Sequence, residues 1–143
     1  MPERAGTVLA FDYGERYVGV AVGDESLGLA HPLDTIETRD DAVRMAAVAA
    51  RVAEWTPQRL VVGLPLAMDG TAHQLTERAR AFAAALEARF RVPVTLVDER
   101  LSSADAESRL RDAGRGGRRH KALAHPVAAQ VILQDYFDAH ATS

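Results

Sequence analysis

Short apolar runs separated by turn residues dominate the start of the chain, and they predict three strands. The runs at residues 8–11 and 18–22 flank a polar segment that contains Gly14, which can adopt positive φ, so they predict a β-hairpin. A third predicted strand, residues 27–36, is interrupted by Pro32. Because proline has no N–H for the ladder, this strand suits a sheet edge or a bulge better than a sheet centre. Together the three strands predict an antiparallel meander.

The spacing of apolar residues changes after this region. Apolar residues from Met45 to Trp55 recur at helical spacing, and Asp40 or Asp41 is a suitable N-cap. Residues 114–121 contain three glycines and no apolar side chain, so they predict a loop. The remaining pattern predicts strands at 59–63 and 93–97 and helices at 71–90, 102–113 and 126–138, the last with a proline in its favourable first position.

This order of elements predicts one α/β domain over residues 1–143. Strands that alternate with helices are expected to be parallel and joined by right-handed crossovers, which gives a mixed five-stranded sheet with helices on both faces. In open sheets of this kind, sites form at the carboxyl ends of the strands. We therefore expect Asp12, the loop after Gly63, and Glu99 to lie at one rim.

The amino-acid composition excludes several classes of protein. The chain has 48% apolar and 26% charged residues and no apolar run of membrane-spanning length, so we expect a cytoplasmic protein without a membrane partner. It contains no cysteine, which excludes disulfides and thiolate metal sites. The net charge is −3, but residues 109–121 carry six basic side chains against one acidic one. This segment is a candidate for binding phosphate groups.

Two carboxylates at one sheet rim repel each other unless a proton or a cation lies between them, and Mg²⁺ is a common solution. Asp12 could instead be a solvated turn initiator. Asp98 and Glu99 should point to opposite faces of their strand, and we favour Glu99 as the partner of Asp12. Arg100 is expected to pair with Asp98 or to contact phosphate. His125, just before the last predicted helix, is either a third ligand or a packing residue.

Four motifs in a fixed order indicate a family. They are LAFDYG at residues 9–14 with VGVAV at 18–22, VGLPL at 62–66 with MDG at 68–70, DERLS at 98–102, and AAQVIL at 128–133. In these motifs the chain resembles the YqgF/RuvX family of Holliday junction resolvase-like nucleases. The resemblance covers nearly the whole chain and implies a ribonuclease H-like fold.

The resemblance implies that Asp12 and Glu99 are catalytic, metal-binding carboxylates of a two-metal phosphodiesterase using Mg²⁺ or Mn²⁺. Family members usually carry an aspartate where this chain has His125. An imidazole there should weaken the binding of the second metal ion and shift the metal preference of the site from Mg²⁺ toward Mn²⁺. The expected contacts to the nucleic-acid backbone come from Arg100, Arg115, Arg118, Arg119 and Lys121.

The function that this resemblance implies is hydrolysis of the small-subunit (pre-16S) ribosomal RNA precursor. Cleavage of branched DNA junctions is one alternative, and would call for a homodimer where RNA trimming needs only a monomer. A second alternative is a catalytically silent module that binds RNA or the ribosome. A third, an actin-like nucleotide-binding module, would need two lobes to enclose its ligand, and this chain supplies one.

Overall fold

The computed structural model describes residues 6–65, 74–98 and 117–140, with residues 117–123 described by their backbone only. Five strands and three helices lie in these ranges. In chain order they are β1 (Thr7–Asp12), β2 (Tyr17–Asp24), β3 (Leu29–Glu37), α1 (Asp41–Trp55), β4 (Arg59–Leu64), α2 (Gln74–Phe90), β5 (Val94–Asp98) and α4 (Gly117–Ala139). The helix expected at residues 102–113 lies outside the described residues.

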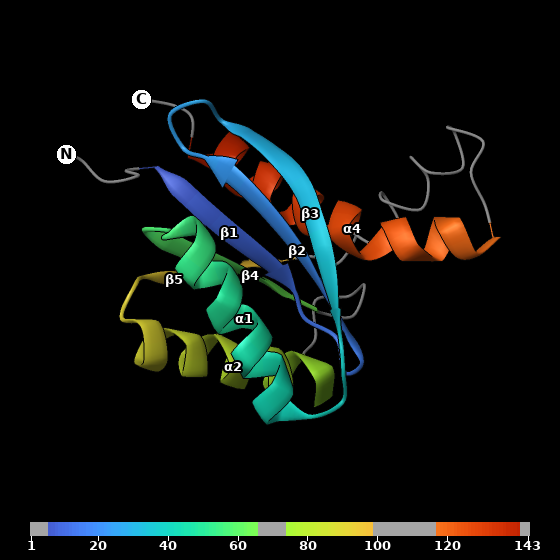
Figure 1. Cartoon of the computed structure of the whole chain (residues 1–143). Coiled ribbons are helices and arrows are strands. Elements are labelled where there is room, and N and C mark those ends of the chain that lie inside the picture. Colours follow the sequence, from blue (N-terminus) through green and yellow to red (C-terminus); the bar gives the residue numbers. More distant parts are fainter. Residues whose placement is uncertain (1–5, 66–73, 99–116, 141–143) are drawn as a thin grey trace.

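The strands form a single mixed sheet in the order β3-β2-β1-β4-β5. β1, β2 and β3 are antiparallel neighbours, whereas β4 and β5 run parallel to β1. Figure 1 shows α1 and α2 on one face of this sheet and α4 on the other. The predicted α/β architecture, with a mixed five-stranded sheet between helices, is therefore confirmed. No helix within the described ranges is long and apolar enough to cross a bilayer.

Two local predictions from the first half of the chain are also confirmed. β3 is an edge strand, and its pairing with β2 slips at Val20/Ala21, where Val20 pairs with Asp34 and Ala21 with Pro32. The proline thus sits at a bulge in an edge strand, where its missing N–H disturbs few ladder bonds. Asp40 is the N-cap of α1, and its carboxylate accepts a 2.9 Å hydrogen bond from the N–H of Val43.

Alternation along the strands divides the core into two layers. On β1, Leu9 and Phe11 pack with residues of α2, whereas Val8 and Ala10 pack with residues of α4. Because side chains alternate along a strand, Asp12 belongs to the face of the sheet that α4 covers. The last helix was expected to be largely buried. In α4 the buried side chains include Val131, Ile132, Leu133, Tyr136 and Phe137.

α4 lies very close to β2 and β3. On β2 the face toward α4 carries three small residues in succession after Tyr17: Gly19, Ala21 and Gly23. A Cβ built at Gly23 would lie 2.7 Å from the ring of Phe137. At the sheet edge, Gln134 Nε2 donates to the carbonyl of Gly28 at 2.8 Å, and Gln134 Oε1 accepts from the N–H of Ala30 at 3.0 Å. Gln130 Nε2 donates to the Ala30 carbonyl at 3.0 Å. These contacts fix the position of α4 along the sheet.

The predicted boundary between the basic loop and the last helix is wrong. α4 begins at Gly117 and contains Pro126 in its interior, so residues 117–121 are helical. Proline in a helix interior removes one hydrogen bond and its ring crowds the carbonyl four residues earlier. After Pro126, α4 packs on the sheet through Ala129, Ile132 and Leu133. The first turns of α4 (orange in Figure 1) project past the sheet.

Candidate metal and nucleic-acid site at the β1 rim

Asp12 ends β1 at the rim where the parallel strands finish. It pairs with Gly63 of β4, and Gly63 pairs with Val97 of β5, so these three residues form one row across the sheet. On its other side Asp12 pairs with Gly19 of β2. Both glycines lack side chains, which leaves the carboxylate without bulky neighbours on either side in its row. Asp12 itself is half-buried.

His125 is brought to the same place by the packing of α4. A Cβ built at Gly19 would lie 1.9 Å from the carbonyl oxygen of His125, so the α4 backbone rests directly on this glycine. Asp12 and His125 therefore adjoin Gly19 from two directions, one along the sheet and one from above it. His125 was expected near a helix N-terminus, and this is wrong, because it lies in the interior of α4.

The ring of His125 is held by an aromatic partner. It stacks on the ring of Tyr17, with ring centroids 4.6 Å apart and an interplanar angle of 15°. Tyr17 lies two residues before Gly19 on β2, hence on the same face of the sheet. The guanidinium of Arg16 lies over the Tyr17 ring at 5.3 Å and pairs with Glu37 at 3.1 Å. The guanidinium of Arg16 and the stacked rings of Tyr17 and His125 thus lie at the same end of the sheet as Asp12.

The turn after Asp12 is fixed from the opposite face by Arg44 of α1. Nη2 of this buried guanidinium donates to the carbonyl of Glu15 at 2.6 Å and to that of Thr38 at 3.0 Å. The two carbonyls belong to the turns that follow β1 and β3. A single buried side chain therefore ties together both turns at this end of the sheet.

The structure describes only some of the other predicted site residues. On β5, Val97 packs with the α4 layer, and Asp98 is exposed and belongs to the opposite face by alternation. Glu99, Arg100 and Arg115 lie outside the described residues. Residues 118, 119 and 121, the remaining basic residues of the expected backbone clamp, lie in the first turns of α4, with only their backbone described.

The donors at this rim suit a divalent cation. Asp12 supplies carboxylate oxygen and His125 supplies imidazole nitrogen, a mixed donor set that favours Mn²⁺ more than an all-oxygen set would. In the part of the chain that the structure describes, no three His, Cys, Asp or Glu residues cluster closely enough to hold a metal. Asp12 and His125 are therefore two potential donors at this rim, and Glu99, the third predicted ligand, lies outside the described ranges.

Tyr17 and Gly19 were not singled out from the sequence. The signal for Gly19 is the strict alternation in VGVAVG, residues 18–23, in which every second residue is glycine or alanine. A strand face made only of small residues indicates that another backbone approaches closely. Tyr17 carries no comparable signal, because its stacking partner is supplied by a distant helix.

Known proteins are similar to this chain over nearly its full length. A model of the RuvX family, described as Holliday junction resolvase, matches residues 6–139. A protein from Methylobacillus flagellatus named "Putative pre-16S rRNA nuclease" is 51% identical over 99% of this chain and all of that protein. A protein of the same name from Dechloromonas aromatica is 52% identical over 94% of this chain and 92% of that protein.

Solved structures share the fold at low sequence identity. Thermus thermophilus RuvC in complex with a Holliday junction substrate superposes with a TM-score of 0.57 at 20% identity, over 95% of this chain and 96% of RuvC. The fowlpox virus resolvase in complex with Holliday junction DNA gives a TM-score of 0.57 at 6% identity, over 95% of this chain and 99% of that one. At such low sequence identity, these superpositions establish only that the chain has the ribonuclease H-like resolvase fold. With the family model matched over residues 6–139 and relatives half identical along nearly its full length, the chain belongs to the RuvX family.

Proposed function

We propose that this chain is a metal-dependent nuclease that hydrolyses phosphodiester bonds in the precursor of 16S ribosomal RNA. One observation carries the proposal: Asp12 ends β1 on the face covered by α4, and His125 of α4 is seated on Gly19, the cross-strand neighbour of Asp12. The named activity of relatives that are half identical over the whole chain supports the same substrate.

We assign the metal-binding, catalytic set to Asp12, Glu99 and His125. Glu99 comes two positions after Val97 in the sequence, which is the spacing of residues on one face of a strand, and Val97 shares a row with Asp12. Divalent ions held there would activate water and stabilise the leaving oxygen. Two carboxylates only partly balance the charge of two such ions, so the second ion is expected to bind more weakly than the first.

We assign contacts with the phosphate backbone to Arg100, Arg115, Arg118, Arg119 and Lys121. The last three precede His125 by four to seven residues on α4. At a rise of 1.5 Å per residue, this is about 6 to 10 Å along the helix axis. Such positive charge could hold the nucleic-acid strand next to the scissile phosphate without reading its sequence.

The decisive experiment measures cleavage of a pre-16S RNA fragment by the wild type and by the Asp12→Asn variant, with Mg²⁺ and with Mn²⁺. The proposal predicts metal-dependent cleavage that Asp12→Asn abolishes, with Mn²⁺ the better ion. Asp138→Asn, an exposed change near the C-terminal end of α4, is the matched control and should cleave like the wild type. RNA cleavage that persists in Asp12→Asn would contradict the proposal.

A second candidate is cleavage of DNA junctions, because the RuvC complex with its junction substrate shares the fold over nearly the whole chain. A four-way DNA junction matched in length to the RNA is the substrate that separates the two. If Asp12-dependent cleavage is confined to the junction, resolvase activity replaces the first proposal. If neither substrate is cleaved but the RNA is bound, the chain is a binding module.

A further inference from the structure

A cavity of about 600 Å³ opens on the face of the sheet opposite the proposed metal site. Its lining residues belong to α1, α2 and the segments that follow β1 and β3. Tyr13, Met45 and Phe82 give it an aromatic and apolar wall, and the Tyr13 and Phe82 rings lie 4.9 Å apart. The rest of the lining is mostly charged, with Glu15, Asp41 and three arginines. A concave site of this volume that combines an apolar wall with convergent charged groups is suited to binding a small charged molecule.

Three arginines line the cavity: Arg39, Arg44 and Arg78. Arg44 is 3% exposed, and its guanidinium lies 5.4 Å from the centre of the Tyr13 ring. Nη1 of Arg44 pairs with Asp41, whose carboxylate is almost fully exposed. The buried Nε has no hydrogen-bond partner among the described residues. Arg44 is thus committed to the protein, through the carbonyls of Glu15 and Thr38, whereas the side chains of Arg39 and Arg78 are exposed and can meet a ligand in the cavity.

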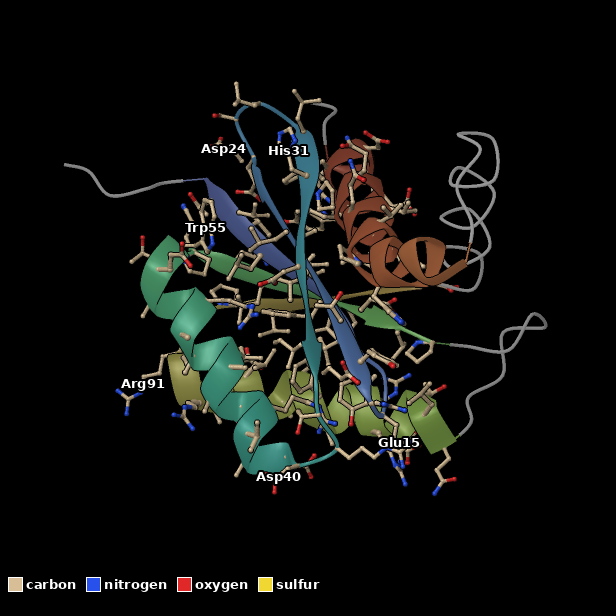
Figure 2. All side chains as sticks on the ribbon, turned by 45° about the vertical axis from the view of Figure 1, so that its right-hand side comes forward. Glu15, Asp24, His31, Asp40, Trp55 and Arg91 are labelled. Carbon is tan, nitrogen blue, oxygen red and sulfur yellow. The ribbon has the colours of Figure 1, made fainter. Side chains whose placement is uncertain are left out.

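The carboxylate of Glu15 already pairs with one of these arginines. It forms an ion pair with Arg78, which links the β1–β2 turn to α2. The hydrogen bond and charge of Arg78, with smaller effects of Arg39 and Arg44, hold the pKa of Glu15 below its usual value. Figure 2 shows Glu15 at the same end of the molecule as Asp40, the N-cap of α1. Its side chain is 68% exposed, so little holds it in place.

We propose that this cavity binds a nucleoside monophosphate, whose phosphate takes the place of the Glu15 carboxylate at Arg78 and is also bound by Arg39. The base then lies against the wall formed by Tyr13 and Phe82. A phosphate monoester carries more charge than a carboxylate, and arginine binds its oxygens in a bidentate manner. The source is either a free nucleotide or the phosphorylated end of an RNA strand.

The proposal makes opposite predictions for two neighbouring charges. In calorimetric titration with AMP, Glu15→Gln removes the competing anion and should tighten binding by up to about fivefold, the equivalent of one exposed ion pair. Arg78→Gln removes a phosphate ligand and should weaken binding about tenfold or more. Arg80→Gln, on the same helix but outside the cavity, is the control and should match the wild type.

Competition between ligands shows which chemical groups the cavity recognises and whether they come from a free nucleotide or from the end of an RNA strand. AMP should bind more tightly than adenosine or inorganic phosphate, because only AMP engages both the arginines and the wall. If a 5′-phosphorylated RNA oligonucleotide displaces AMP, the ligand is a strand end, and if it does not, the ligand is a free nucleotide. Asp12→Asn should leave AMP binding unchanged, which separates this site from the proposed nuclease activity. Failure of the wild type and Glu15→Gln to bind AMP at millimolar concentration, or equal affinities of Glu15→Gln and Arg78→Gln, would overturn the proposal.

Discussion

The carbonyl oxygen of His125 occupies the space into which a side chain on Gly19 would extend. A Cβ built at Gly19 lies 1.9 Å from that oxygen and 2.4 Å from its carbonyl carbon. Both are backbone atoms, so neither can turn away as a flexible side chain would. Gly19 is also the cross-strand neighbour of Asp12. Gly19 therefore sets the distance between the α4 backbone and β2, the strand next to the one that carries Asp12.

Replacing Gly19 with alanine should push α4 away from β2. We expect the free energy of unfolding to fall by about 2 to 3 kcal/mol, the range seen when a packed interior is overfilled, as measured by urea denaturation. Gly28→Ala is the control, because no heavy atom lies within 4 Å of its built Cβ and only its φ of +68° opposes a side chain. That change should cost about 1 kcal/mol. If the free energy of unfolding falls equally in the two variants, α4 can move away from Gly19 without an added cost in stability.

The Tyr17 ring should keep the His125 imidazole in the orientation that binds metal. Tyr17→Ala removes the stack, which is worth about 1 kcal/mol, so Mn²⁺ affinity measured by calorimetry should fall about fivefold. Tyr17→Phe keeps the ring and should bind Mn²⁺ like the wild type. If both variants bind Mn²⁺ as the wild type does, the stack has only a packing role.

His125→Asp should convert the mixed donor set into an all-carboxylate one. The added negative charge favours Mg²⁺, so we expect tighter Mg²⁺ binding and a smaller advantage of Mn²⁺ in RNA cleavage. His125→Ala, which supplies no donor, is the matched control and should weaken the binding of both ions. An unchanged ratio of Mn²⁺- to Mg²⁺-supported cleavage in His125→Asp would exclude residue 125 as a ligand.

The ion pair between Glu15 and Arg78 should make stability depend on acid pH. Because Arg78 holds the pKa of Glu15 below its ordinary value of 4.5, the pair stabilises the fold above that pH. Its contribution is lost as the pH falls through the lowered pKa and the carboxylate becomes protonated. The difference in Tm between the wild type and Glu15→Gln should therefore shrink from pH 6 toward pH 3. Glu54→Gln, on the exposed surface of α1, is the control. A difference that stays constant over this range would show that the pair does not stabilise the fold.

The sequence alone determined the five strands, the first two helices and their order along the chain. Apolar periodicity, Pro32 and the Asp40 cap are local signals, and the structure confirms the edge strand, the bulge and the start of α1. The same signals put Asp12 at the end of a strand, and the rules for parallel sheets placed that end at the site rim. Such features depend on neighbours in the chain, so a single sequence carries them.

The tertiary structure decided where the last helix begins and what His125 contacts. Pro126 is a helix-start signal in the sequence, because proline is favoured at the first helical position, yet α4 begins at Gly117 and runs through it. The approach of His125 to Gly19, and its stacking on Tyr17, join segments from opposite ends of the chain. No local pattern encodes such a contact. It follows from the register of α4 on the sheet, which is set by many side chains packing at once.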